Sequence, residues 1–276
     1  MTDSSAAKAG DAVISIRGVS MSYSGRRVLD RVDLDVRRGE ILVLLGGSGS
    51  GKTTLLKQVL GLAKPETGSI TIKGVDITCC SQSELGAVRR HIGVAFQAGA
   101  LFNSLSVEEN VALPLQELTQ LADSTIKLVV WLKLIAVGLS DAGSLYPPEL
   151  SGGMRKRAAV ARAMALDPEI LILDEPSAGL DPIVSAELDQ LILFLKRSFN
   201  VTILVVTHEL ESAFRIADRV AMLYQGRLIA VDSKEQFSCN AHPRIRQFLD
   251  RQPDALPGVA AEEFIASFLR GSRHDQ

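Results

Sequence analysis

A glycine-rich stretch that contains one lysine, GGSGSGKTT from Gly46 to Thr54, has the residue types and spacing needed to bind phosphate. It directly follows the apolar run ILVLL and fits the pattern G-x-x-x-x-G-K-[ST]. Glycine permits torsions that let successive backbone N–H groups curl around phosphate oxygens, and it leaves no side chain in the way. A helix that starts near Lys52 would add partial positive charge at its N-terminus. We therefore predict a phosphate loop between a strand that ends at Leu45 and this helix.

Within the phosphate loop, two side chains have distinct expected roles. Lys52 would reach the β- and γ-phosphates of a nucleotide, and Thr53 would place its hydroxyl on Mg²⁺. The other residues of the loop are expected to contribute to nucleotide binding: Gly46, Gly47, Ser48, Gly49, Ser50, Gly51 and Thr54. Taken alone, the loop indicates nucleotide binding and no particular activity.

A second motif, EILILDEP from Glu169 to Pro176, supplies the groups for hydrolysis. Its apolar residues place Asp174 at the end of a buried strand, where the carboxylate can hold Mg²⁺ through water. Glu175 follows at once and can accept a proton from an attacking water. The pair is therefore predicted to act beside the phosphate loop.

The flanking sequence predicts the elements that would position these groups. Short strands are expected between about residues 13 and 45, and HIGVAF is a short buried strand. The apolar runs EILILD and VTILVVTH are typical of parallel strands that are buried on both faces. KTTLLKQVLGL and MRKRAAVARAMAL are expected to be helices, and the segment from about residue 98 to 149 also has helical periodicity. RVAMLYQGRLIAVD predicts a closing hairpin.

The composition excludes several classes of protein. The 276 residues include 30 Lys and Arg against 32 Asp and Glu, and a net charge of −2 gives no sign of nucleic-acid binding. Cys79, Cys80 and Cys239 lack zinc-site spacing and are expected to be reduced thiols. The N-terminal MTDSSAAKAG lacks the apolar stretch of a signal peptide, and no apolar run reaches the ~18 residues of a membrane span.

The order of the remaining motifs resembles that of a known family. LSGGM, from Leu150 to Met154, precedes LILDEP, and SAGLDP and VVTHE follow. Gln97 in VAFQAGALF lies between the phosphate loop and LSGGM. Over about residues 13–232 this series is similar to the ATPase subunits of ATP-binding cassette (ABC) transporters. The resemblance implies that the nucleotide is ATP, bound with Mg²⁺.

The resemblance also implies a fold and a domain organisation. The expected fold class is α/β, a RecA-like P-loop core with an N-terminal antiparallel β subdomain and an inserted α-helical subdomain. A disordered arm is expected at residues 1–11 and the ATPase domain at 12–232, with the helical subdomain at about 98–165. Residues 233–276 would form a C-terminal extension that contacts another subunit.

Three residues acquire expected roles within one subunit from this resemblance. Tyr23 looks like the aromatic residue that stacks on adenine. Gln97 looks like the residue that contacts Mg²⁺ and the attacking water and reports to the membrane partner. His208 would contact the γ-phosphate, and its place directly after the apolar run TILVVT puts it at a strand end.

Other residues acquire roles across a homodimer. Ser151, Gly152 and Gly153 would cap the γ-phosphate that is bound by the opposite subunit, and Asp181 would communicate between subunits. Ser151 is also placed to cap a helix whose N–H groups and dipole point toward an anion. The family motif most often ends in glutamine, so Met154 removes a polar contact while the serine and glycines remain.

A narrower resemblance points to lipid transport. LSGGMRKRAAVARAMALDPEILILDEPSAGLDPI and GVAFQAGALFNSLSVEENVALPL look like the ATPases of Mce-associated lipid transporters, the Mla type. This implies movement of phospholipid or a related lipid between membranes, by a complex on the cytoplasmic face of the inner membrane. The implied partners are a permease, an Mce-domain substrate-binding protein and a small STAS-like accessory protein. The apolar residues after Gln97 would line a groove for a permease helix or pack in the core: Leu101, Phe102, Leu105 and Val107.

Three rival functions stay open at this point. A cassette ATPase that acts on DNA or ribosomes usually carries a long insertion, a coiled coil or two cassettes, and this chain shows none of these. The second rival is a cassette transporter of a small polar solute or an efflux substrate, against which the LSGGM helix and the Gln97 region favour lipid by resemblance alone. A catalytically inactive binding module would be expected to lack Lys52 or Glu175, and both are present.

The C-terminal tail contains two predicted apolar helical faces. RIRQFLDR places Ile245, Phe248 and Leu249 on one side of a helix. AAEEFIASFLRG forms a second apolar stripe, made of Phe264, Ile265, Phe268 and Leu269. The second stripe would either pack on its own cassette or dock on another subunit.

Overall fold

The computed structural model describes residues 12–253. The chain divides into two compact units between Phe237 and Ser238, and the first unit contains every motif from the phosphate loop to His208. The arm expected at residues 1–11 and the apolar stripe from Phe264 to Leu269 lie outside the described residues.

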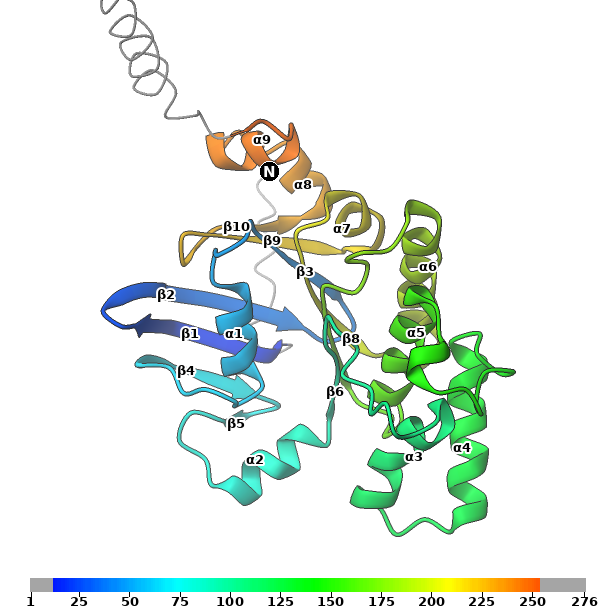
Figure 1. The fold of residues 1–276 in the computed structure, drawn as a ribbon. Coiled ribbons are helices and arrows are strands. Elements are labelled where there is room, and N and C mark those ends of the chain that lie inside the picture. Colours follow the sequence, from blue (N-terminus) through cyan, green and yellow to red (C-terminus); the bar gives the residue numbers. More distant parts are fainter. Residues whose placement is uncertain (1–11, 254–276) are drawn as a thin grey trace, which may run out of the picture. The chain divides into compact units, whose positions relative to one another are not determined.

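The first unit begins with an antiparallel sheet, drawn in blue and cyan in Figure 1. Its strands are β1 (Ala12–Tyr23), β2 (Arg26–Arg37), β4 (Thr67–Ile72) and β5 (Val75–Asp76). They lie in the order β2-β1-β4-β5 and every pair is antiparallel. Alternate residues of β1 such as Ile14 and Ile16 are buried, as expected for a sheet with one face on the core.

A second sheet forms the centre of the unit. Its strands are β3 (Ile41–Leu45), β6 (Ile92–Ala95), β7 (Ile170–Asp174), β8 (Thr202–Thr207), β9 (Arg219–Tyr224) and β10 (Arg227–Ser233). They lie in the order β10-β9-β3-β8-β7-β6, and only the β9–β10 pair is antiparallel. The predicted buried parallel strands and the closing hairpin are thereby confirmed.

The register of the central sheet gathers three strand ends at one edge. Leu45 at the end of β3 lies opposite Thr207 at the end of β8, and Asp174 at the end of β7 lies opposite Val206. Parallel strands bring the segments that follow them to the same edge, which is where open α/β sheets bind ligands. The phosphate loop, Glu175 and His208 therefore emerge side by side.

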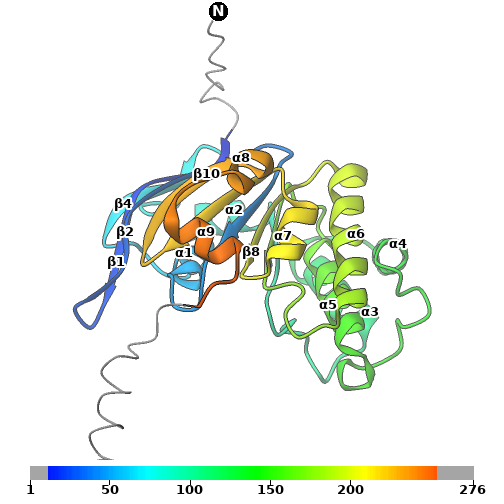
Figure 2. The ribbon, with the colours of Figure 1, turned by 90° about the horizontal axis from the view of Figure 1, so that it is seen from above.

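Helices cover the sheets and fill the connections. In chain order they are α1 (Lys52–Val59), α2 (Gln82–Arg89), α3 (Val107–Leu118), α4 (Asp123–Ala136), the short 3-10 helix η1 (Pro147–Glu149), α5 (Gly152–Ala163), α6 (Pro182–Phe199), α7 (Leu210–Ile216) and α8 (Lys234–Ser238). Figure 2 shows α3, α4, α5 and α6 on the side of β8 away from the antiparallel sheet. The helices predicted in KTTLLKQVLGL, in MRKRAAVARAMAL and after residue 98 are confirmed as α1, α5, α3 and α4.

Helix α2 was not predicted from the sequence, although a signal for it was present. Helix α2 begins with a capping box in which Ser81 and Glu84 satisfy each other's backbone N–H groups. Its short amphipathic pattern, with Leu85 and Val88 buried, was too weak to identify without that box.

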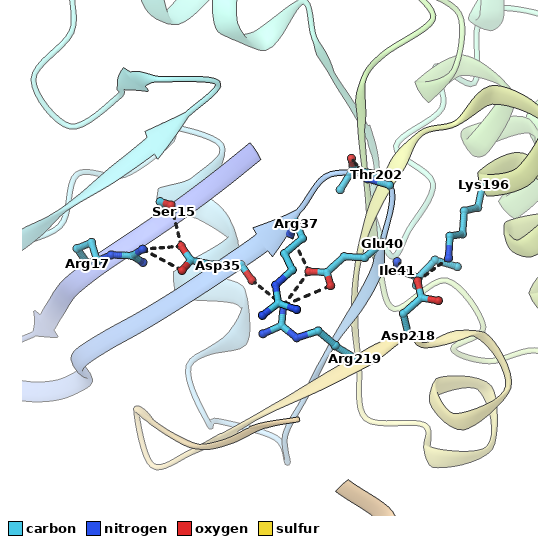
Figure 3. A network of polar contacts seen from close by, with 11 residues as sticks. Ser15, Arg17, Asp35, Arg37, Glu40, Ile41, Lys196, Thr202, Asp218 and Arg219 are labelled. Atoms are coloured by element: carbon cyan, nitrogen blue, oxygen red, sulfur yellow. Dashed lines mark hydrogen bonds and ion pairs between the residues drawn. The ribbon is translucent and has the colours of Figure 1, made fainter. Parts of the chain in front are cut away.

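A chain of polar contacts joins the two sheets at the end opposite the strand tips described above (Figure 3). Arg219 at the start of β9 donates to the carboxylate of Glu40 at 3.0 Å and to the main-chain oxygen of Asp35 on β2 at 3.3 Å. Glu40 also accepts the backbone N–H of Arg37 at 2.7 Å. The Asp218 carboxylate accepts the N–H of Ile41 at 2.6 Å, which fixes the first residue of β3. The start of β3 is therefore anchored on both sheets.

The second unit contributes one described helix. Helix α9 (Pro243–Leu249) confirms the helix predicted in RIRQFLDR. Its first position is proline, which is suited to a helix start because the missing N–H would have no helical partner. Among residues 12–253, no helix is both long and apolar enough to cross a bilayer.

Candidate functional site

The phosphate loop joins β3 to α1 as predicted. Lys52 is the first residue of α1, and its side chain is only 8% exposed. Its ammonium group donates to the main-chain oxygens of Gly46 at 2.6 Å and Gly47 at 3.1 Å. The lysine therefore lies inside the curl of the loop, where a phosphate oxygen would replace these carbonyl partners.

Two loop glycines occupy positions that exclude any side chain. A Cβ atom on Gly46 would lie 2.5 Å from the main-chain oxygen of Leu223 and 2.6 Å from the hydroxyl of Ser50. Gly51, the residue before α1, has φ 108° and lies against Val28 and Leu29 of β2. Glycine is therefore required for close packing at Gly46 and for backbone conformation at Gly51. The Ser50 hydroxyl is buried and has no hydrogen-bond partner among the described residues, which leaves a donor available at this loop.

The two acidic residues lie at the end of β7 as predicted, and their backbones differ. Asp174 is the last residue of the strand and is partly exposed. Glu175 is 9% exposed and has φ 47°, a left-handed conformation that is uncommon for residues other than glycine. Its carboxylate accepts a hydrogen bond from the hydroxyl of Thr207 at 3.1 Å and lies 2.9 Å from Nδ1 of His208. The strained backbone thus directs Glu175 sideways, toward the end of β8.

Electrostatic interactions link the loop to the acidic pair. Burial lowers the pKa of Lys52, and attraction to Glu175 and Asp174 partly offsets this effect. Burial raises the pKa of Asp174, the adjacent Glu175 raises it further, and Lys52 and Lys156 oppose the shift. A lysine and two carboxylates within mutual electrostatic range at one strand edge form a site suited to a polyanion with a bound cation.

The main chain of Gln97 is linked to that of Glu175 by a shared hydrogen-bond donor. Gln97 lies two residues after the end of β6, and its side chain is exposed. Its carbonyl accepts a hydrogen bond from the ammonium group of Lys156 at 2.6 Å, and the same ammonium group donates to the carbonyl of Glu175 at 2.9 Å. The structure therefore brings Gln97, Glu175, His208 and Lys52 together, and these four residues are called the Lys52 cluster below.

The LSGGM segment has the local geometry expected of a helix start. Ser151 caps α5, and its hydroxyl accepts the backbone N–H of Met154 at 3.3 Å, so the predicted cap is confirmed. A Cβ atom on Gly153 would lie 2.5 Å from Val184 on α6. Asp181 caps α6 and accepts the N–H groups of Ile183 and Val184, both at 3.0 Å. Ser151 and Asp181 thus share a neighbourhood next to α6, and neither is hydrogen-bonded to the Lys52 cluster in the described part of the chain.

Tyr23 and the threonines of the loop occupy exposed or partly exposed positions. Tyr23 is the last residue of β1, beside the tight turn to β2, and nearly half of its side chain is exposed. Thr53 is exposed in the first turn of α1, and Thr54 is partly buried.

The donors proposed for Mg²⁺ are hard oxygen ligands. No group of three or more His, Cys, Asp and Glu residues within 12–253 is arranged to hold a metal ion by itself. The expected ligands are instead one hydroxyl, one amide and one carboxylate, from Thr53, Gln97 and Asp174. Such a sparse set fits Mg²⁺, which keeps several waters and binds through substrate phosphates.

Sequence reasoning missed two residues of this site. Thr207 ends β8 and donates to Glu175, and its place directly before His208 was a usable signal. Lys156 had no such signal, because one cation among the residues MRKR at a helix start looks like its neighbours.

One of the apolar residues after Gln97 is part of the core. Val107 has no exposed surface and is the first residue of α3, so of the two alternatives left open by the sequence it packs in the core. Phe102 is 52% exposed, and Leu101 and Leu105 are partly exposed. A separate apolar hollow of about 260 Å³ lies between α1, α2 and β6, lined by Leu60, Leu62, Arg89, Ile92, Val94 and Phe96.

Sequence comparisons place the chain in a known family of proteins. A family model described as ABC transporter matches residues 29–178. The intermembrane phospholipid transport system ATP-binding protein MlaF of Escherichia coli K12 is 42% identical over 262 residues, which cover 94% of this chain and 97% of that protein. The probable ribonucleotide transport ATP-binding protein mkl of Mycobacterium leprae is 42% identical over 250 residues, or 91% of this chain and 72% of that protein.

Solved structures agree with these sequence relatives. The ATP-binding cassette MJ0796, in a dimeric post-hydrolysis state bound to ADP and Pi, matches with a TM-score of 0.74 and 29% identity over 80% of this chain and 98% of that one. The protein cbiO1 from Clostridium perfringens, part of the transporter complex cbiONQ, matches with a TM-score of 0.78 and 28% identity over 87% and 99%.

Proposed function

The chain belongs to the ABC transporter family and is an ATP-hydrolysing subunit, and on that basis we propose that it drives a transporter of phospholipid or a related lipid between membranes. The observation that carries the lipid assignment is the identity of 42% to MlaF along 97% of that protein's length. The alternative is a transporter of a small polar solute, because an equally identical relative is named for ribonucleotide transport.

The proposed chemistry assigns each side chain of the Lys52 cluster a step. The N–H groups of the loop and the Lys52 ammonium bind the phosphates of ATP, and Tyr23 stacks on adenine. Glu175 takes the proton of the attacking water, because its carboxylate is held in place by Thr207 and His208. When bound at Thr53, Asp174 and Gln97, Mg²⁺ would neutralise charge on the β- and γ-phosphates. His208 is then placed to contact the γ-phosphate.

The positions of Ser151 and Asp181 support a head-to-tail homodimer. In the described chain Ser151 shares the neighbourhood of α6 and is not hydrogen-bonded to the Lys52 cluster. A serine-capped helix with two glycines in its first turn is a suitable anion site, and a second copy would bring it to the phosphate. Dimeric solved relatives support this arrangement.

A permease helix is proposed to dock at the apolar surface beside Gln97. The hollow between α1, α2 and β6 includes the exposed side chains of Leu62 and Phe96. Phe102 adds a further exposed aromatic side chain in the segment that follows Gln97. A helix-in-groove contact needs apolar anchors of this kind, and its position next to Gln97 would connect the permease to the nucleotide site.

A different surface is available for an accessory partner. Helix α4 exposes about half of each of Leu128, Trp131 and Leu132, and a cavity of about 610 Å³ lies between α3 and α4. Exposed apolar surfaces of this kind mark interaction sites. We propose that another subunit of the complex docks on this face. An Mce-domain protein would join through the permease, and the whole complex would place this chain as a peripheral subunit on the cytoplasmic face of the inner membrane.

Copurification of the complete complex followed by lipid mass spectrometry tests the substrate assignment. The expected result is a phospholipid enriched in the complex and stimulation of ATP turnover after reconstitution in membranes that contain it. The assignment is wrong if no lipid is enriched and a ribonucleotide or another polar solute stimulates turnover instead.

A further inference from the structure

Lys156 of α5 connects two segments of the catalytic site through their main chains. Its ammonium group donates to the carbonyl of Gln97 at 2.6 Å and to the carbonyl of Glu175 at 2.9 Å. These two residues follow different strands, β6 and β7, and are far apart in the sequence. One side chain therefore sets the spacing between the segment that carries Gln97 and the segment that carries Glu175.

The environment of Lys156 favours this fixed position. The side chain is partly buried, and no carboxylate of residues 12–253 forms an ion pair with it within 4 Å. Burial lowers its pKa, and the opposing attraction comes from Asp174, Glu175 and Glu209. A partly desolvated ammonium group needs hydrogen-bond acceptors, and here main-chain carbonyls supply them.

Glu175 has a particular need for such an anchor. Its φ of 47° is strained for a residue with a side chain, and strain of this kind persists only where surrounding groups hold it. Its backbone N–H donates to the carbonyl of Val206 at 2.8 Å. Its carbonyl accepts from Lys156 at 2.9 Å and from the N–H of Ala178 at 3.3 Å. Lys156 is thus the side-chain support for the backbone that directs the Glu175 carboxylate.

A second cation of α5 holds the same segment further along. Arg162 donates to the carbonyls of Gly99 at 3.0 Å and Ala100 at 2.8 Å. Ala100 has φ 49°, so this connection is also locally strained. Lys156 and Arg162 are separated by about 9 Å along the helix axis, as the rise of an α-helix gives. Helix α5 therefore holds residues 97–100 at two points.

We propose that Lys156 is a positioning residue for ATP hydrolysis, which holds the Glu175 and Gln97 backbones in the arrangement that places the attacking water. The proposal rests on the proposed role of Glu175 as the general base. In this role α5 contacts the backbone of Glu175 within the same chain. This contact is separate from the proposed contact between the start of α5 and the nucleotide bound by a second copy.

The test uses the full-length chain and three substitutions. Lys156→Met removes the charge and both hydrogen bonds at similar side-chain length, whereas Lys156→Arg keeps the charge and N–H donors that can form them. Lys64→Met is the matched control, because Lys64 is an exposed lysine in the connection after α1. We expect Lys156→Met to lower kcat by ~10- to 100-fold with less than about a threefold change in KM for ATP, as displacement of a catalytic group would do. Lys156→Arg should recover most of that loss, and the control should match the parent.

Hydrogen exchange separates positioning from a general loss of structure. In Lys156→Met, amides of residues 97–100 and 175–178 should exchange faster while those of β3 and β8 keep their protection. The proposal is overturned if kcat stays within about twofold of the parent, or if KM rises with kcat unchanged. It is also overturned if exchange increases throughout the first unit and Lys156→Arg fails to recover turnover. Parental turnover in Glu175→Gln would instead refute the base assignment, whatever Lys156 does.

Discussion

Replacement of Glu175 by glutamine tests the proposed chemistry most directly. The carboxylate accepts the Thr207 hydroxyl at 3.1 Å and lies 2.9 Å from His208, and a glutamine side chain has the same length with one oxygen acceptor. The site should therefore keep its shape and its affinity for ATP. What it loses is a group that can accept a proton at neutral pH.

The expected loss is the usual contribution of a general base. Removal of such a group lowers turnover by ~10²–10⁴-fold. Each tenfold step corresponds to about 1.4 kcal/mol in the activation barrier, so the barrier should rise by about 2.7–5.4 kcal/mol. The fold of the site contributes little to this difference, because the left-handed backbone of residue 175 is held by main-chain contacts that the substitution leaves intact.

Two assays on the same preparations measure this effect. Phosphate release in single-turnover and steady-state conditions gives the rate, and titration with a fluorescent ATP analogue gives the affinity. Glu117→Gln is the matched control, since Glu117 is an exposed carboxylate on α3. Turnover within a few-fold of the parent, together with unchanged nucleotide binding, would refute the reasoning and move the base to another group.

Three further predictions concern assembly, the permease and pH. In the Glu175→Gln variant, ATP should induce dimers that are detectable by light scattering. Adding Ser151→Arg should abolish these dimers, because the arginine side chain would place bulk against the phosphate. Dimers in the double variant would contradict the proposed homodimer. Phe102→Asp should leave the melting temperature near the parental value and reduce copurification with the permease, and parental yield would remove this residue from the docking surface. Glu169 is hydrogen-bonded to Lys73 and Arg38, and the Lys73 contact is the main cause that lowers its pKa below 4.5. Because the pKa of Glu169 is lowered in the folded state, its carboxylate stabilises the fold above pH 4.5, and this stabilisation is lost as the pH falls through the pKa of the folded state. Glu169→Gln should therefore lower the melting temperature at pH 7 and match the parent at strongly acidic pH. An equal decrease in melting temperature at both pH values would count against this ion pair.

The sequence by itself determined the local chemistry of this protein. GGSGSGKTT could be assigned to a phosphate loop because strand, glycines, lysine and helix start are contiguous, and their physics acts over a few residues. The same holds for the Ser151 cap, the buried strand before Asp174 and the hairpin after Arg219. The sequence left two alternatives open for Val107, because an apolar residue at a helix start has the same local pattern in a core and in a groove.

Only the tertiary structure decided how these pieces meet. The register of β3, β7 and β8 brings Lys52, Glu175 and His208 to one edge, although they lie far apart along the chain. The contacts of Lys156 with the carbonyls of Gln97 and Glu175 follow from the packing of α5 against the ends of two strands. Every residue has a main-chain carbonyl, so the sequence does not indicate which carbonyls a given lysine will contact. The chemistry of each side chain can be read from the local sequence, whereas hydrogen bonds between segments that are far apart in the sequence depend on how the strands and helices are arranged in three dimensions.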